Sequence, residues 1–283
     1  MKLLPLAIFS LVAFGFAKDG MFSDALPKNW NADVLASFQF SRHHYSNWNK
    51  GSDGVNTNVW LLKYDADVIG HFSHFDWRNI VDLEWGQTYT KGSGTRKTND
   101  KIFLETTVSE NDLKPFEPYA GLRFESQFTK SYTYSDDDVE TPVSCFMDPG
   151  YFTQMLGVSY APNDNFRQSL AFANRMTISR GYGFADDADT DKFEKFKDEP
   201  GLESVTEYKA SLSSLASFKT RLWAFVNFEG VDEIDGKWEN TLDITIAPLL
   251  VLSVGVDIAY DKDIDEDSQY RDAINLGITW RWF

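Results

Sequence analysis

The chain has 283 residues, enough for one large β domain or two smaller domains. Its 43 acidic residues outnumber its 27 basic residues, and the formal net charge of −16 excludes a nucleic-acid-binding protein, which needs a basic surface. Aromatic residues make up 16% of a chain whose mean hydropathy is −0.37, a combination that does not fit a helical membrane protein.

The first residues have the pattern of a secretory signal peptide. Lys2 supplies a positive start, residues 3–14 are mostly apolar, and small residues precede a cleavage site after Ala17. This apolar run is shorter than the roughly 20 residues that a transmembrane helix needs. We therefore expect a signal peptide over residues 1–17, a periplasmic N-terminal segment over 18–30 and the folded domain over 31–283.

Beyond residue 30, apolar and polar residues alternate in segment after segment, which predicts 12 β-strands. Most of these segments have nine residues or more. Strands of soluble proteins average about 5–6 residues, whereas strands that cross a membrane need about 9–11. The predicted strands cover residues 32–41, 60–68, 75–85, 101–108, 120–128, 152–160, 166–178, 208–212, 218–228, 238–246, 250–260 and 274–282.

The polar face of these strands carries charges in mid-strand, which the core of a β-sandwich could not bury unpaired. A barrel that spans lipid needs this pattern, with apolar side chains outward and polar side chains toward the lumen. We predict an all-β fold, a 12-stranded antiparallel transmembrane β-barrel of the bacterial outer-membrane type. The candidates for lining its lumen are Arg78, Asp82, Glu84, Arg123, Glu125, Lys219, Arg221, Glu239 and Asp243.

The connections between strands support this interpretation because long or polar segments alternate with short turns. Outer-membrane barrels have longer external loops and short periplasmic turns, so both termini are expected in the periplasm. The apolar last strand, which ends at Phe283, is expected to engage the barrel-assembly machinery. A soluble periplasmic β protein is the architectural alternative. The predicted long segments are residues 42–56, 86–96, 130–144, 180–200, 229–236 and 261–269.

Several short motifs are similar to those of an outer-membrane β-barrel family known only as a domain of unknown function. The motif residues are Asn47, Trp48 and Gly51, followed by Lys97 and Asp100. Other similar segments are residues 126–128, 149–151 and 162–166, and the resemblance extends over most of residues 40–283. Ser52 departs from the pattern, which has a second glycine there. The resemblance implies an outer-membrane barrel and brings no activity, cofactor or catalytic residue.

Acidic runs near residues 136–138, 186–191 and 261–267 are expected to be solvated external loops that face lipopolysaccharide. Alternating aspartates also suit divalent cations, but the EF-hand spacing is missing because Glu266 occupies the position of the loop glycine. The segment 91–97 resembles a phosphate-binding loop without its required spacing and favours a flexible hairpin. We expect no cofactor and no resident metal.

Three functions fit these features. The first is a passive channel for small polar solutes or ions through a lumen of mixed charge. The second is a non-conducting envelope or surface-binding barrel that acts through its acidic loops. The third is a lipid hydrolase at the barrel rim that uses His43 or His44, although the sequence marks no nucleophile.

Overall fold

The computed structural model describes residues 27–43, 56–134, 140–186, 193–230, 234–261 and 265–282. The expected signal peptide and the motif residues Asn47, Trp48 and Gly51 lie outside these ranges, as do His44 and most of the acidic runs. The described part contains no helix long and apolar enough to cross a membrane.

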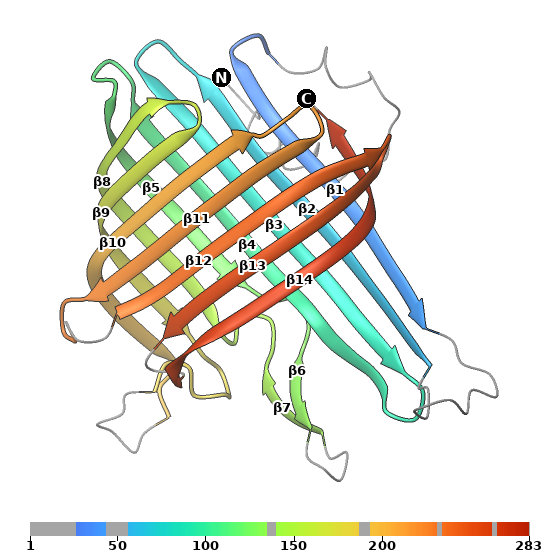
Figure 1. Cartoon of the computed structure of the whole chain (residues 1–283). Coiled ribbons are helices and arrows are strands. Elements are labelled where there is room, and N and C mark those ends of the chain that lie inside the picture. The colour runs from blue at the N-terminus through green and yellow to red at the C-terminus, as the bar shows by residue number, and fades with distance from the viewer. Residues whose placement is uncertain are drawn as a thin grey trace.

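Twelve antiparallel strands close into one barrel, as Figure 1 shows, so the predicted fold is confirmed. Neighbours along the chain are neighbours in the barrel, except that β8 follows β5 in space because a separate hairpin intervenes. The barrel strands are β1 (Trp30–His43), β2 (Thr57–His71), β3 (Phe75–Thr90), β4 (Gly94–Glu110), β5 (Phe116–Ser126), β8 (Gly150–Asn163), β9 (Phe166–Ile178), β10 (Phe196–Ser211), β11 (Ala216–Asn227), β12 (Ile234–Ala247), β13 (Leu250–Asp261) and β14 (Asp265–Trp282).

The first and last strands close the barrel, with Val34 opposite Trp282 and Phe38 opposite Ile278. The same end of the barrel holds the start of β1, because Trp30 lies opposite Gly70 beside the turn between β2 and β3. We call this end, where every connection is short, the turn end, and the opposite end the loop end. The apolar end of the last strand, β14, is therefore paired with β1 at the turn end.

Large apolar side chains cover the outside of the barrel. Leu156, Phe172 and Ile274 are 67%, 68% and 71% exposed. Exposed apolar surface costs about 25 cal/mol per Å² in water, and a continuous belt of it marks a surface that faces lipid. Because successive side chains of a strand point to opposite faces, the residues between these positions point inward.

Aromatic side chains mark both ends of this apolar belt. Near the turn end, Trp30 packs edge-on against Trp77, with ring centroids 5.7 Å apart, and covers Gly70. Near the loop end, Trp60 and Trp85 lie 4.4 Å apart in the same manner. These pairs occupy the two interfacial positions at which membrane barrels place aromatic girdles.

Predicted loops at the loop end overlap strands of the structure: 229–236 contains the start of β12 at Ile234, and 261–269 contains the start of β14 at Asp265. The predicted loop 86–96 is only the turn 91–93, because β3 and β4 stay paired up to Thr90 and Gly94. The predicted loop 180–200 contains the start of β10 at Phe196. The predicted loop 130–144 contains a hairpin of β6 (Ser131–Tyr134) and β7 (Glu140–Ser144), which projects from the barrel in Figure 1. Outside lipid, a strand can be polar on both faces, so the alternation that reveals a strand disappears.

Candidate functional site

The lumen is the candidate site, and the register of the sheet decides which side chains enter it. All nine predicted lumen residues lie on the inward face. Lys63, Glu84 and Lys101 pair across three strands, and their inward neighbours Arg123, Lys219 and Arg221 follow the same alternation. The structure adds carboxylates from β4 and β10 that the list of candidates lacks.

Arg123 on β5 is a deeply buried cation of the lumen. Its Nε donates to Glu105 at 2.7 Å, and its Nη1 and Nη2 donate to both carboxylate oxygens of Glu203 at 2.6 and 3.1 Å. The side chains of Arg123 and Glu203 are 3% and 1% exposed. The indole of Trp223 donates a further hydrogen bond to Glu203 at 2.8 Å. Charges this well buried persist only when they are paired and hydrogen-bonded.

A second arginine, Arg78 on β3, reaches across the lumen. Its Nε and Nη2 donate to the two oxygens of Asp67 on the adjacent strand, at 2.9 and 2.8 Å. Its Nη1 donates to Glu207 on β10 at 2.8 Å. Glu207 also accepts from Arg221 at 2.9 Å, and Arg221 lies 3.5 Å from Glu105. One continuous ion-pair network therefore crosses the barrel from β2 to β11.

Lys101 on β4 joins two strands that lie on opposite sides of the barrel. Its ammonium bonds Asp82 on the neighbouring strand and lies 3.3 Å from Glu239 on β12, which is six strands away around the barrel. Arg123 and Arg221 lie over the ring of Phe103, 5.6 and 5.4 Å from its centroid. The aromatic face stabilises guanidinium groups that have left bulk water.

These contacts fill the side of the lumen lined by β3 to β5 and β8 to β11. We call this region, bounded by Lys101 and Glu239, the packed half. The cavity between Arg78, Arg123 and Glu207 has a volume of about 30 Å³, room for about one water molecule. Near the loop end of the same half, Arg175 bonds Asp235 at 2.6 Å and Glu199 at 3.1 Å. The space left among these ion pairs is therefore about the size of a water molecule.

The opposite wall, formed by β13 and β14, has small side chains along its middle and charged ones toward its ends. We call it the open half. A Cβ atom built on Gly255 would have no neighbour nearer than 3.9 Å. The charged residues that border the open half are well exposed: the side chains of Lys219, Arg271 and Arg281 are 47%, 58% and 50% exposed. The small inward residues of this wall are Ser253, Gly255, Ala259, Ala273 and Asn275.

The nine predicted residues divide between these regions. Arg78, Arg123 and Arg221 belong to the packed half, and Lys219 and Asp243 border the open half. Glu84 pairs with Lys63 at 2.9 Å and accepts from Asn99 at 2.8 Å. Asp82 and Glu239 bind Lys101 between the two halves, and Glu125 lies opposite Tyr151 nearer the loop end.

Sequence reasoning missed Glu203 and Glu207 because it started the eighth strand at Tyr208. A signal was present, since the charged residues Lys197, Glu199, Glu203 and Glu207 all fall on odd positions and so share one face of a strand. This signal is interrupted by a segment with the composition of a turn, Asp198-Glu199-Pro200-Gly201. In the structure this segment is strand.

The motif residues Lys97 and Asp100 hold the chain where β5 leaves the barrel. The carboxylate of Asp100 accepts the backbone N–H groups of Phe128 and Thr129 at 2.6 and 2.9 Å. Lys97 lies 3.0 Å from Asp100 and donates to the carbonyl of Thr129 at 3.2 Å. This arrangement anchors the base of the β6–β7 hairpin and has no direct contact with the lumen network.

The described residues contain no group of three or more His, Cys, Asp or Glu side chains placed to hold a metal ion. His71 and His74 each bond an aspartate at the turn end, Asp76 at 2.9 Å and Asp112 at 2.8 Å. The side chains of His43 and His44 lie outside the described part. The hypothesis of a rim hydrolase therefore stays a prediction.

No curated protein matches the sequence. Solved structures resemble it at low identity. An outer membrane channel from Pseudomonas putida F1 is 11% identical over 94% of this chain and 100% of that chain, with a TM-score of 0.45. The translocator domain of the autotransporter NalP from Neisseria meningitidis is 12% identical over 92% of each chain, with a TM-score of 0.37. The outer membrane protein opdK from Pseudomonas aeruginosa is 8% identical over 89% and 98%, with a TM-score of 0.32.

A family model matches a shorter segment than the motifs predict, since it ends well before residue 283. The matched segment runs from the loop end of β1 to the hairpin and contains the positions of all five motif residues. The predicted resemblance to a family without known activity is confirmed there: residues 40–132 match the family described as "Protein of unknown function (DUF3078)".

Proposed function

We propose that this protein is an outer-membrane β-barrel that acts as a passive channel for small polar solutes or ions. Its turn end, with the first and last strands, faces the periplasm, and its loop end faces outward. The apolar belt and the aromatic girdles support a membrane location. The order of short and long connections supports the orientation.

The unequal filling of the lumen is the observation that carries the channel proposal. Ion pairs close the packed half, whereas Gly255 and its small neighbours leave space along β13 and β14. A wet passage of mixed charge along one wall passes small ions and excludes larger solutes, because its width is set by the cross-lumen pairs. The channel is therefore off-axis and narrow.

Single-channel recording in planar bilayers tests this function. The wild type is expected to give small, discrete current steps. Gly255→Phe places a ring in the open half and is expected to abolish them, whereas Val256→Phe, on the lipid face of the same strand, is the matched control and is expected to preserve them.

A bilayer without current steps, from protein shown to be inserted, would overturn the channel proposal. The same result would favour a non-conducting envelope barrel. The ion pair of Lys101 with Glu239 is the observation behind that second candidate, because it spans the full width of the lumen.

A further inference from the structure

Among the described residues, β1 and β14 are not paired along the whole height of their junction. The two strands pair only from Val34 opposite Trp282 to Gln39 opposite Gly277. β1 continues to His43 with β2 as its partner, and β14 extends back to Asp265 with β13 as its partner. In the described part of both strands, no pairing joins Phe40 to Leu276 or continues beyond them.

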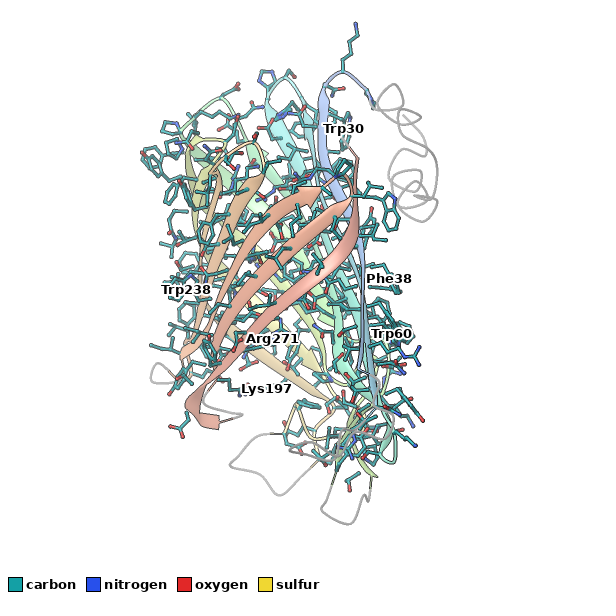
Figure 2. All side chains as sticks on the ribbon, turned by 45° about the vertical axis from the view of Figure 1, so that its right-hand side comes forward. Trp30, Phe38, Trp60, Lys197, Trp238 and Arg271 are labelled. Carbon is teal, nitrogen blue, oxygen red and sulfur yellow. The ribbon has the colours of Figure 1, made fainter. Side chains whose placement is uncertain are left out.

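Figures 1 and 2 show the consequence in space. The ribbons of β1 and β14 meet at the turn end and run apart toward the loop end in both views. Figure 2 shows Arg271 on the β14 side of this divergence, and Phe38 and Trp60 on the β1 side. We call the region between Phe40 and residues 270–276 the seam.

The seam lies at the depth of the outer leaflet. With a rise of about 3.3 Å per residue and a tilt near 45°, each strand residue climbs about 2.3 Å across the membrane. Residues 276 to 270 therefore lie about 14 to 28 Å from the turn-end residue Trp282, in a hydrocarbon layer about 25 Å thick. The seam adjoins the half of the bilayer nearer the loop end.

The backbone N–H and C=O groups along this stretch of β14 need hydrogen-bond partners. Unpaired N–H and C=O groups in hydrocarbon each cost several kcal/mol. A purely apolar filling of the seam leaves that cost unmet. Water from the open half, or a polar group carried by a molecule in the seam, satisfies these donors and acceptors.

The two sides of the seam have the complementary character that an amphiphile requires. On the lipid side, Phe40, Ile274 and Leu276 are 56%, 71% and 51% exposed. On the lumen side, Gly255 and Ala273 carry no side chain larger than a methyl group, and a Cβ atom at Gly255 would have no neighbour nearer than 3.9 Å. An acyl chain can therefore lie against the apolar lipid side of the seam while its head group, at the same depth, lies on the polar lumen side.

Arg271 supplies the charge at this position. Its Nε and Nη2 both donate to the same oxygen, Oδ2, of Asp257. Its Nη1 makes no hydrogen bond to any described residue, and its side chain is 58% exposed. A carboxylate or sulfate fits such a guanidinium edge through charge-assisted hydrogen bonds.

We propose that the seam is a lateral portal through which single-chain anionic amphiphiles move between the outer leaflet and the lumen, with Arg271 binding their head group. This activity is separate from axial conduction of polar solutes. The two therefore fail independently, since a barrel without current steps can still bind an amphiphile.

Disulfide trapping in phosphatidylcholine vesicles tests whether the seam is open. Cys145 is the only native cysteine, so Cys145→Ala provides a cysteine-free background. The control pair Phe38→Cys with Ile278→Cys lies on directly opposed positions and is expected to oxidise rapidly. Phe40→Cys with Leu276→Cys lies two residues further along each strand, in the same pairing phase, and is expected to stay reduced.

Rapid oxidation of the second pair would overturn the portal, because it would show β1 and β14 paired at this depth. The single variant Phe40→Cys provides a further test. A disulfide-linked dimer of it would show that a second copy occupies the seam edge, which would also overturn the proposal.

Binding of dansyl-labelled undecanoate to the folded protein tests the head-group assignment. Arg271→Gln is expected to weaken binding about tenfold, the effect of one lost charge-assisted hydrogen bond. Arg281→Gln is the matched control, an inward arginine of the same strand near the turn end, and is expected to bind like the wild type. Dodecyltrimethylammonium is expected not to compete.

Equal affinity of Arg271→Gln and the wild type, or equal loss in both arginine variants, would overturn the role of Arg271. Circular dichroism and heat-modifiable gel mobility establish that each variant retains the folded barrel. A loss of binding by unfolding is thereby separated from a loss at the portal.

Discussion

Replacing Arg123 by methionine probes the packed half directly. The substitution removes the cation that lies 2.7 Å from Glu105 and 2.6 Å from Glu203, and it leaves the buried carboxylate of Glu203 without its arginine. Removing one partner of a buried ion pair costs about 3–5 kcal/mol. The exposed fraction of Glu203, 1%, puts this site in that range, because bulk solvent does not reach its carboxylate.

The matched control is Arg271→Met, the same substitution at an exposed inward arginine. Its partner Asp257 stays accessible to water, so the expected cost is about 0–1 kcal/mol. Urea titration of the barrel in lipid vesicles, followed by tryptophan fluorescence, measures both free energies of unfolding. A cost for Arg123→Met no larger than that for Arg271→Met would refute the claim that this half of the lumen is dry.

Two further predictions concern the width of the lumen and the packing of its wall. Lys101→Ala removes the cross-lumen bridge to Glu239 and is expected to raise single-channel conductance and shift selectivity toward cations, measured as a reversal potential in a salt gradient. Unchanged conductance and selectivity would show that this pair does not limit the passage. Gly157→Ala would place a Cβ atom 2.2 Å from the carbonyl oxygen of Leu170 and is expected to destabilise the barrel by more than about 1 kcal/mol, whereas Gly236→Ala, with no atom nearer than 3.8 Å, is expected to be close to neutral in the same urea titration. Equal unfolding midpoints would contradict the close approach of β8 and β9.

The alternation of residues along single strands was enough to predict the barrel and its inward face. Ile274, Leu276 and Ile278 alternate with Ala273, Asn275 and Gly277, and in the structure the first set faces outward. This works because lipid imposes one rule on every outward position of a spanning strand.

This rule applies only to residues within the membrane, and the strand prediction failed for segments that extend beyond it. Residues 86–96 and 196–200 carry polar side chains on both faces or a proline in the strand, and they were predicted as loops. The hairpin β6–β7 is short and polar for the same reason.

The ion-pair network could be predicted only in part. Arg78 and Arg123 were identified as inward from their own strands, but their partners Glu207 and Glu203 lie more than 75 positions away in the sequence. Which charges meet across a lumen depends on the shear and width of the whole barrel. The division into a packed half and an open half follows from these long-range contacts, and no local pattern encodes it.

Thiol labelling in vesicles tests this division most directly. In the Cys145→Ala background, Gly255→Cys places a thiol in the open half, and Ala171→Cys places one in the packed half, where Ala171 is 2% exposed. A small, charged, water-soluble maleimide is expected to modify Gly255→Cys quickly and to leave Ala171→Cys unmodified until the barrel is unfolded. Equal labelling of the two folded variants would contradict the account, because water would then reach both walls of the lumen alike.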